Sequence, residues 1–315
     1  MIVTIFNRRR QQRGVALITA LLIVSLASVM AVTLVADQQI DIRRTANVVD
    51  GDRAMVFAMA VESWVKHILA RDDATKDSLN EDWAAVLPPI TVEGGQVAGR
   101  IEDMQGRFNL NNLVTVTGQP SLPDIEIFKR LLVGFGLDPD LVEPLIDWID
   151  TDIDPRFEGG GGAEDNEYSN YPQPYRTANQ KMASPSELML VKGFTREIYE
   201  QLIPHVGVLP ERTQININTA TVPVLMALAP DITQAAAEAV VELRKERGLS
   251  NTGEMTNLPG MQGKVFPQNG LDIKSNYFLM DASARYGDRG RIRLYSLLVR
   301  KSNKVEVVMR AQGVY

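Results

Sequence analysis

An uncharged apolar run, residues 15–36, constrains this chain more than any other feature, because a basic segment directly precedes it. The run has 22 residues, and its only polar members are hydroxyl side chains: Thr19, Ser25, Ser28 and Thr33. As a helix it would be about 33 Å long, which spans the hydrocarbon core of a bilayer. All the flanking positive charge lies on the N-terminal side, at Arg8, Arg9, Arg10 and Arg13. The positive-inside rule therefore predicts a cytoplasmic N-terminus, with the chain after Ala36 across the membrane.

A cleaved secretory signal peptide is the competing interpretation of this segment. Such signals have an apolar stretch of only about 7–15 residues, which is shorter than the run seen here. Beyond Ala36 the apolar residues continue at helical spacing, and no proline interrupts them before Pro88. The pattern predicts a transmembrane helix over 15–36 that continues as one helix to about Leu69.

Composition limits the partners of the remaining chain. The chain has 33 basic and 39 acidic residues, and removing the four arginines of residues 1–14 leaves 29 basic residues and a net charge of −10. This acidity disfavours nucleic acid or anionic lipid as the main partner. Cysteine is absent, so packing, partners or a metal must hold the domain instead of disulfides. Only two histidines, His67 and His205, are present, which disfavours a histidine-rich zinc site.

Strand patterns occur early and late in the chain. Residues 90–93 and 96–101 alternate like a hairpin around Gly94-Gly95, and residues 273–284 and 291–310 are rich in β-formers. We expect these segments to form one antiparallel sheet against the long helix. The sequence therefore predicts an α/β domain built from residues 37–107 and 271–315.

The segment between these strands, 108–270, has the pattern of an inserted helical domain with weak internal repetition. Phe108-Asn-Leu-Asn precedes predicted helices at 124–135 and 141–149, and Ile215-Asn-Ile-Asn precedes predicted helices at 222–228 and 233–247. A partial third copy follows Ser184. The repeat resembles helix-hairpin-helix modules, many of which bind DNA phosphates through a glycine-rich hairpin.

Two features of the second repeat argue against DNA. Its hairpin, residues 229–232, lacks the glycines that expose backbone N–H groups to phosphate. Residues 211–260 contain six acids and four bases. A structural or protein-contacting use is favoured over DNA binding.

The most chemically specific stretch is an acidic loop, residues 147–167, with eight acids in 21 residues. Calcium takes six to eight oxygen ligands and would neutralise such a loop. Asp150, Asp152 and Asp154 alternate like the opening of an EF-hand, but the sixth position is Pro155 and the twelfth is Gly161. An EF-hand is therefore excluded. Two interpretations stay open at this point: an irregular calcium loop, and a solvated acidic loop without metal.

Nothing in the sequence favours an enzyme. Paired carboxylates can act in glycosidases, but the chain has no Gly-x-Ser-x-Gly, phosphate-binding lysine loop or His-Glu-x-x-His motif. Both histidines are expected to be packing or surface residues. We expect no catalytic residues.

The basic segment, Gly14 and the apolar helix together resemble the type IV prepilin signature. The resemblance implies that a prepilin peptidase cuts between Gly14 and Val15 and that the helix is kept for filament assembly. The family usually has glutamate at the fifth mature position, where this chain has Thr19. That departure is typical of one subfamily, the K-type minor pseudopilins of type II secretion. The segments 147–152 and 162–165 and the pair Pro174-Tyr175 also match this subfamily.

The resemblance implies an α+β fold, in which a pilin-like long N-terminal helix packs on an antiparallel sheet and carries a large, mostly helical insertion. It also implies structural calcium, and the expected metal ligands are Asp150, Asp152, Asp154, Glu164 and Asp165. The implied function is a minor pseudopilin that caps the pseudopilus tip and initiates assembly for export of folded proteins across the outer membrane. The alternative is a minor pilin of a type IV pilus or DNA-uptake system with a DNA-binding module.

The same resemblance gives the partners and the location. The partners would be the I- and J-type minor pseudopilins, the prepilin peptidase and the inner-membrane secretion platform. The protein would be a single-pass inner-membrane protein with a periplasmic C-terminal domain. The missing glutamate has a physical interpretation, because an intramembrane carboxylate is costly without a partner. A subunit at the tip has no neighbour above it to pair with, and Thr19 can bond its own helix instead.

Overall fold

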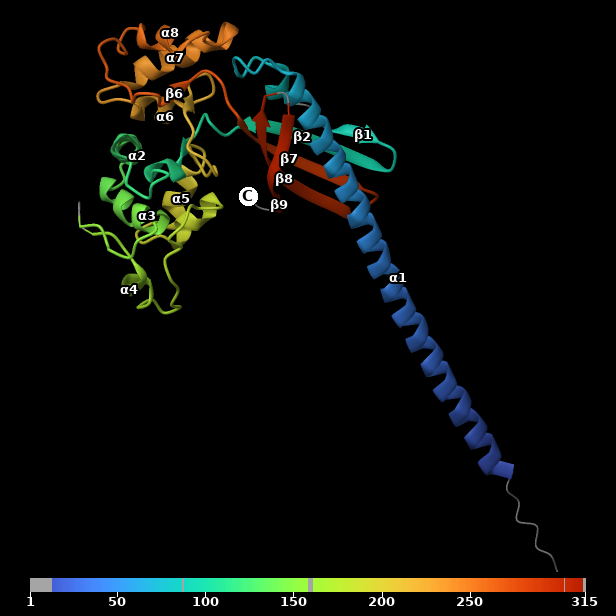
Figure 1. Cartoon of the computed structure of the whole chain (residues 1–315). Coiled ribbons are helices and arrows are strands. Elements are labelled where there is room, and N and C mark those ends of the chain that lie inside the picture. Colours follow the sequence, from blue (N-terminus) through green and yellow to red (C-terminus); the bar gives the residue numbers. More distant parts are fainter. Residues whose placement is uncertain (1–12, 87, 158–160, 303, 314–315) are drawn as a thin grey trace, which may run out of the picture.

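The computed structural model describes residues 13–86, 88–157, 161–302 and 304–313 of the chain. It contains a long helix, a five-stranded sheet beside the C-terminal part of that helix, and a mostly helical domain to one side (Figure 1). Most of the predicted leader, residues 1–12, lies outside the described residues.

Helix α1 (Arg13–Arg71) is continuous for 59 residues and ends two residues beyond the predicted position. Its N-terminal part projects away from the rest of the molecule, and the apolar side chains there are exposed to the surroundings of the protein (Figure 1). It is the one helix among the described residues that is long and apolar enough to cross a membrane. Thr19 Oγ1 lies 3.0 Å from the carbonyl oxygens of Val15 and Ala16, so its hydroxyl bonds its own helix.

The sheet is antiparallel throughout, with the strand order β1-β2-β7-β8-β9. Its strands are β1 (Ile90–Val92), β2 (Gly95–Asp103), β7 (Tyr277–Tyr286), β8 (Gly290–Lys301) and β9 (Lys304–Gln312). One early hairpin and three late strands therefore meet in one sheet. The predicted α+β, pilin-like fold is confirmed.

Helix α1 packs across one face of this sheet through a stripe of buried apolar side chains. Ala58, Val61, Val65 and Leu69 recur at three- and four-residue spacing and form one core with the inward residues of β7 and β8. Full burial of each larger side chain stabilises the packing by about 1.5–3 kcal/mol. A Cβ on Gly99 of β2 would lie 3.0 Å from Val61 Cγ1, so the missing side chain allows the close approach. The α1 and sheet unit is called the pilin-like domain below.

The inserted domain has its own, larger core. Its helices are short and begin with α2 (Leu122–Gly134) and α3 (Val142–Ile149). The others are α4 (Asp165–Tyr168), α5 (Arg196–Leu202), α6 (Val222–Ala227), α7 (Gln234–Arg247) and α8 (Thr252–Thr256). The 3-10 helices η2 (Leu110–Leu113), η3 (Pro139–Leu141) and η5 (Pro185–Leu190) also belong to this domain, whereas η1 (Asp82–Ala84) lies between α1 and β1.

Two short parallel ladders join distant parts of the inserted domain. Strand β3 (Phe108–Asn109) pairs with β4 (Val206–Gly207), and β5 (Ile215–Asn216) pairs with β6 (Leu271–Asp272). The second pairing moves a predicted boundary, because residues 271–272 were expected in the pilin-like domain. The Ile217 N–H donates to the Asp272 carbonyl at 3.0 Å, and this bond holds β6 in the inserted domain. The pilin-like domain resumes at Tyr277.

The Asn-x-Asn repeats have a structural role in the fold. Asn109 is buried, accepts from the Leu209 N–H at 3.0 Å and donates to the Glu211 carbonyl at 2.9 Å. Asn216 is also buried and donates to the Asp103 carboxylate at 2.8 Å. Each amide satisfies backbone or carboxylate groups of a crossing segment, which a buried polar side chain must do. These contacts account for the repeats without nucleic acid.

Candidate metal centre

The acidic loop leaves the C-terminal end of α3 and returns at the N-terminal end of α4. Carboxylate oxygens of Asp150, Asp152 and Glu164 lie within 4.8 Å of one another. Asp150 follows the last residue of α3, and Glu164 is the residue before α4. Two helix ends and the intervening loop therefore bring three of the five predicted ligands together.

Buried oxygens at this point have no hydrogen-bond donor among the described residues. They are Asp150 Oδ1, Glu164 Oε1 and Asn179 Oδ1. A buried polar atom without a partner costs about 1–3 kcal/mol, and more when it is charged. Oxygens are the ligands that hard cations prefer. The donor set therefore fits calcium.

Electrostatics at the cluster point to the same ligand class. Burial, together with the charges of Asp152 and Asp147, raises the pKa of Asp150 to about 7. Burial likewise raises the pKa of Glu164 to about 7, with nearby acids adding to the rise and a Thr177 hydrogen bond opposing it. Without a cation, these carboxylates would share the site only by keeping protons near neutral pH. A divalent cation would stabilise the ionised form.

Asp147 closes the loop. It is buried on α3 and accepts from the Arg156 N–H at 3.2–3.3 Å. The Gly162 N–H donates to the Arg156 carbonyl at 2.5 Å, so the returning segment of the loop lies against the segment that leaves α3. A Cβ on Gly162 would collide with the Asp147 carboxylate. Burial raises the pKa of Asp147 to about 6, and its contacts give it a positioning role.

Two predicted ligands lie outside the cluster. Asp154 is exposed, and its N–H donates to Asp152 Oδ1 at 3.0 Å. Asp165 Oδ1 accepts from the Thr177 N–H at 3.0 Å and from the Thr177 hydroxyl at 2.8 Å. In this arrangement Asp165 fixes the segment that follows α4, and the Asp152 side chain turns the loop by accepting from the Asp154 backbone.

Asn179 and Thr177 were not identified from the sequence. Asn179 has a φ of 45°, a left-handed conformation that Asn tolerates better than most residues, and its amide donates to the Asp152 carbonyl at 2.9 Å. The Thr177 hydroxyl has one proton, and its oxygen lies 2.8 Å from Glu164 Oε2 as well as from Asp165 Oδ1. Both orient groups of the cluster. The only sequence signal was an Asn and a Thr in a polar segment, which is common in loops.

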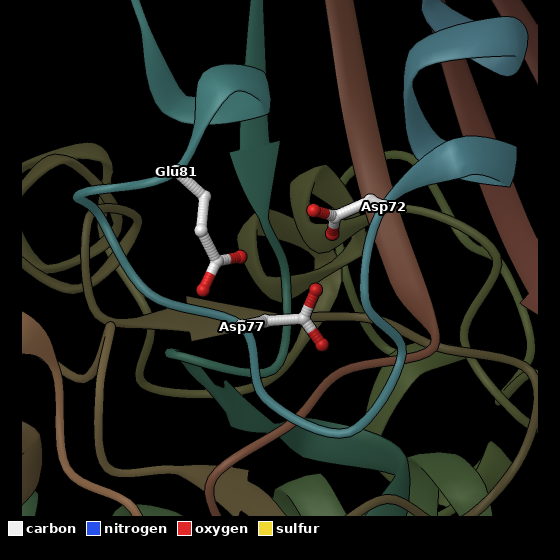
Figure 2. Close-up of side chains that lie close together, drawn as sticks. All are labelled: Asp72, Asp77 and Glu81. Carbon is white, nitrogen blue, oxygen red and sulfur yellow. The ribbon is translucent and has the colours of Figure 1, made fainter.

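A second acidic group lies where α1 joins η1, and there an arginine supplies the positive charge. Figure 2 shows Asp72, Asp77 and Glu81 converging at this junction. The Arg300 guanidinium donates to Asp72 Oδ2 at 2.9 Å and to both Asp77 oxygens. Glu81 accepts from Trp83 Nε1 at 2.8 Å. These contacts compensate the acids, so we assign no metal here.

The hairpin of the second repeat carries a carboxylate at its turn. Asp231, between α6 and α7, has a φ of 56°, where DNA-binding hairpins use glycine. A carboxylate at this position would repel a phosphate. The turn gives no support to DNA binding.

The predicted processing site, Gly14 and Val15, lies in the first turn of α1. No other part of the described chain comes within 4 Å of a Cβ built on Gly14, and Val15 is exposed. The junction therefore has room for another protein to approach it.

Comparison with known proteins gives consistent matches. The family described as "Type II secretion system (T2SS), protein K" matches residues 106–211 and 215–274. Type II secretion system protein K of Pseudomonas aeruginosa is 35% identical over an alignment of 319 residues. The alignment covers 97% of this chain and 94% of that protein. The protein of the same name from Aeromonas hydrophila is 33% identical over an alignment of 333 residues, which covers 96% of this chain and 98% of that protein.

A solved structure shares the fold. It is a chain of the GspK-GspI-GspJ complex from the type 2 secretion system of enterotoxigenic Escherichia coli. The TM-score is 0.75 at 25% sequence identity, and the match covers 86% of this chain and 100% of that chain.

Proposed function

Because this chain belongs to the protein K family of type II secretion systems, whose members are minor pseudopilins, we propose that it caps the tip of a pseudopilus and initiates its assembly for protein export. The observation that carries the proposal is the position of the inserted domain. It lies beside the C-terminal end of α1, far from the N-terminal end that would sit in the membrane (Figure 1). A domain of this size obstructs the space that a subunit stacked above would need.

The intramembrane part of α1 supports the same position. In related pilins a glutamate at the fifth mature position pairs with the subunit above, and here Thr19 satisfies its hydroxyl within its own helix. A tip subunit needs no partner above it. The exposed apolar length of α1 below the sheet supplies a surface for neighbouring helices of the same kind.

The proposed partners are the I- and J-type minor pseudopilins, since the matching structure is of a GspK-GspI-GspJ complex. We further propose that the prepilin peptidase removes residues 1–14 and leaves Val15 as an N-methylated terminus. The mature protein then stays in the inner membrane, with its C-terminal domains in the periplasm and in contact with the secretion platform. The family is a structural component of the machinery, and we propose no catalytic role.

Structural calcium in the acidic loop is part of the proposal. Asp150, Asp152 and Glu164 would hold the ion, with Asn179 as a further oxygen ligand. Its binding would order the loop on which α4 and the following segment pack. The alternative of a DNA-uptake pilin has no support from the Asp231 turn or from the buried Asn-x-Asn contacts.

Site-specific cross-linking tests the tip position directly, because the chain has no native cysteine. Val56 on α1 is 62% exposed, and Val265 between α8 and β6 is 84% exposed. In a complex assembled with the other pseudopilins, Val56→Cys should cross-link to neighbouring subunits, and Val265→Cys should not. Cross-links from both positions to pseudopilin subunits would contradict a capping role.

A further inference from the structure

The face of the sheet opposite α1 carries a group of arginines in an otherwise acidic chain. Val97 and Ile101 of β2 pack toward α1, so strand alternation turns the residues between them to the outer face. Strand register then aligns three rows across β2, β7 and β8. The rows are Gln96–Arg285–Arg291, Ala98–Ser283–Arg293 and Arg100–Asp281–Tyr295.

Asp281 is the one acid in these three rows, and two arginines already share it. Arg293 donates to both Asp281 oxygens at 2.7 and 2.8 Å, and Arg100 Nε donates to Oδ2 at 3.1 Å. The Asp281 side chain is 7% exposed, whereas each arginine side chain is about half exposed. One buried carboxylate therefore balances one of two arginines, and Arg100 takes a second pair with Glu102.

The row Gln96–Arg285–Arg291 has no acid to balance its two arginines. Arg285 and Arg291 face each other directly across β7 and β8, and both are exposed. Neither has an ion pair or a side-chain hydrogen bond within the part of the chain that the structure describes. Like charges directly opposite on a sheet are destabilising. The fold therefore maintains two unpaired, adjacent guanidinium groups.

Between the arginines the surface is hollowed. One depression of about 310 Å³ is lined by Gln96, Arg285 and Arg291, and a second of about 350 Å³ by Arg100 and Arg293. Ala98 and Ser283 line both, so small side chains form a shared floor with arginines at the rim. We call this surface the arginine groove. Guanidinium groups recognise carboxylates through paired N–H donors.

We propose that the arginine groove docks an extended segment of a partner protein that is rich in aspartate or glutamate. Charge complementarity selects this occupant, because the groove presents unpaired guanidinium groups. The small side chains of its floor leave room for an extended peptide. The proposal goes beyond tip capping. The inserted domain packs on the other end of this face, with Leu209 against Tyr277 and Leu279, and the arginine groove lies at the end near the β7–β8 turn.

Distance argues against a membrane as the occupant. The β7–β8 turn packs against Asp50, because a Cβ on Gly287 would lie 3.5 Å from the Asp50 carboxylate. Asp50 is 14 residues beyond Ala36, the last residue of the apolar run, which is about 21 Å of helix. The headgroup layer extends about 5–8 Å beyond the hydrocarbon core, so about 13–16 Å separates it from the turn, which approaches twice the Debye length of about 8 Å at physiological salt. Lipid phosphates are therefore screened from the groove.

Binding of a defined peptide to the full chain in detergent tests the proposal. The probe is a fluorescent peptide of alternating Glu and Ser, and the matched control peptide has Gln in place of Glu. The test variant combines Arg285→Gln and Arg291→Gln. The control variant combines Arg71→Gln and Arg196→Gln, two exposed arginines outside the groove that remove the same charge.

We expect the groove variant to bind the acidic peptide about tenfold more weakly, with little change for the control variant. Its melting temperature should not fall, because the substitutions remove a repulsion. Equal loss from both variants, equal binding of both peptides, or no binding at low salt would overturn the proposal. A loss of peptide binding only in nanodiscs of anionic lipid would also overturn it, since lipid would then cover the groove.

Discussion

Replacing Asp150 by Asn should change the stability of the protein in opposite directions with and without calcium. Without metal, the Asp150 carboxylate is buried beside other acids, and its pKa is raised to about 7. A raised carboxyl pKa favours the native state below the unfolded value near 3.9, and this advantage is lost as pH rises through the native value. At pH 8 the shift of about three units corresponds to a penalty of at most about 4 kcal/mol, at 1.36 kcal/mol per unit. Asn carries no charge and avoids that penalty.

Calcium reverses this order. An ion at 100 times its dissociation constant stabilises the native state by about 2.7 kcal/mol, and the variant loses one of the three clustered carboxylates. At about 2–4 °C per kcal/mol for a domain of this size, the wild type should gain roughly 5–10 °C in calcium. The variant should gain little.

Thermal unfolding of the full chain in detergent checks this at pH 8, in chelator and in excess calcium. We expect Asp150→Asn to melt above the wild type in chelator and below it in calcium, and the difference in chelator should vanish near pH 4. Asp154→Asn, at an exposed carboxylate outside the cluster, is the matched control and should show no reversal. Equal destabilisation of Asp150→Asn in chelator and in calcium would contradict the assignment of Asp150 as a calcium ligand.

Three further outcomes follow from the contacts. Calcium affinity, measured by titration calorimetry, should fall by up to about 100-fold from pH 8 to pH 6, because two ligands with a pKa of about 7 must lose protons to bind; an affinity independent of pH would contradict the ligand assignment. Gly162→Ala should destabilise the loop by about 1–3 kcal/mol through overlap with Asp147, and unchanged melting in both chelator and calcium would show that the overlap is relieved freely. Arg300→Met should lower the free energy of unfolding by about 3–5 kcal/mol in denaturant, because Asp77 is left buried without its arginine. Arg196→Met, at an exposed ion pair, should lower it by about 0–1 kcal/mol. Similar losses at both sites would contradict the stabilising role of the buried pair.

The elements with long periodic patterns could be predicted from the sequence. Helix α1 has one apolar stripe over its packed part. Strand β2 follows the alternating segment 96–101, and β7 and β8 fall in long segments rich in β-formers, so local patterns specify these elements. The short strand β6 could not be predicted in this way. It has two residues, and its place in the inserted domain depends on a partner 56 residues earlier in the chain.

The acidic cluster could be predicted only in part, for a related reason. The resemblance named five acids, and Asp150, Asp152 and Glu164 are the three that converge. A sequence pattern cannot separate these from an acid that fixes a neighbouring segment, as Asp165 does. Asn179 lies 27 residues from Asp152, and its left-handed backbone brings its amide to the loop. Such a contact arises from tertiary packing, which no local pattern encodes.

The decisive measurement for the proposed function is the chemical identity of the first residue in protein extracted from membranes, because anchoring, assembly and tip position all require a processed and retained α1. Mass spectrometry should find an N-methylated Val15 followed by the intact apolar helix. A chain that still begins at Met1, or one that lacks residues 15–36, would contradict the proposed function.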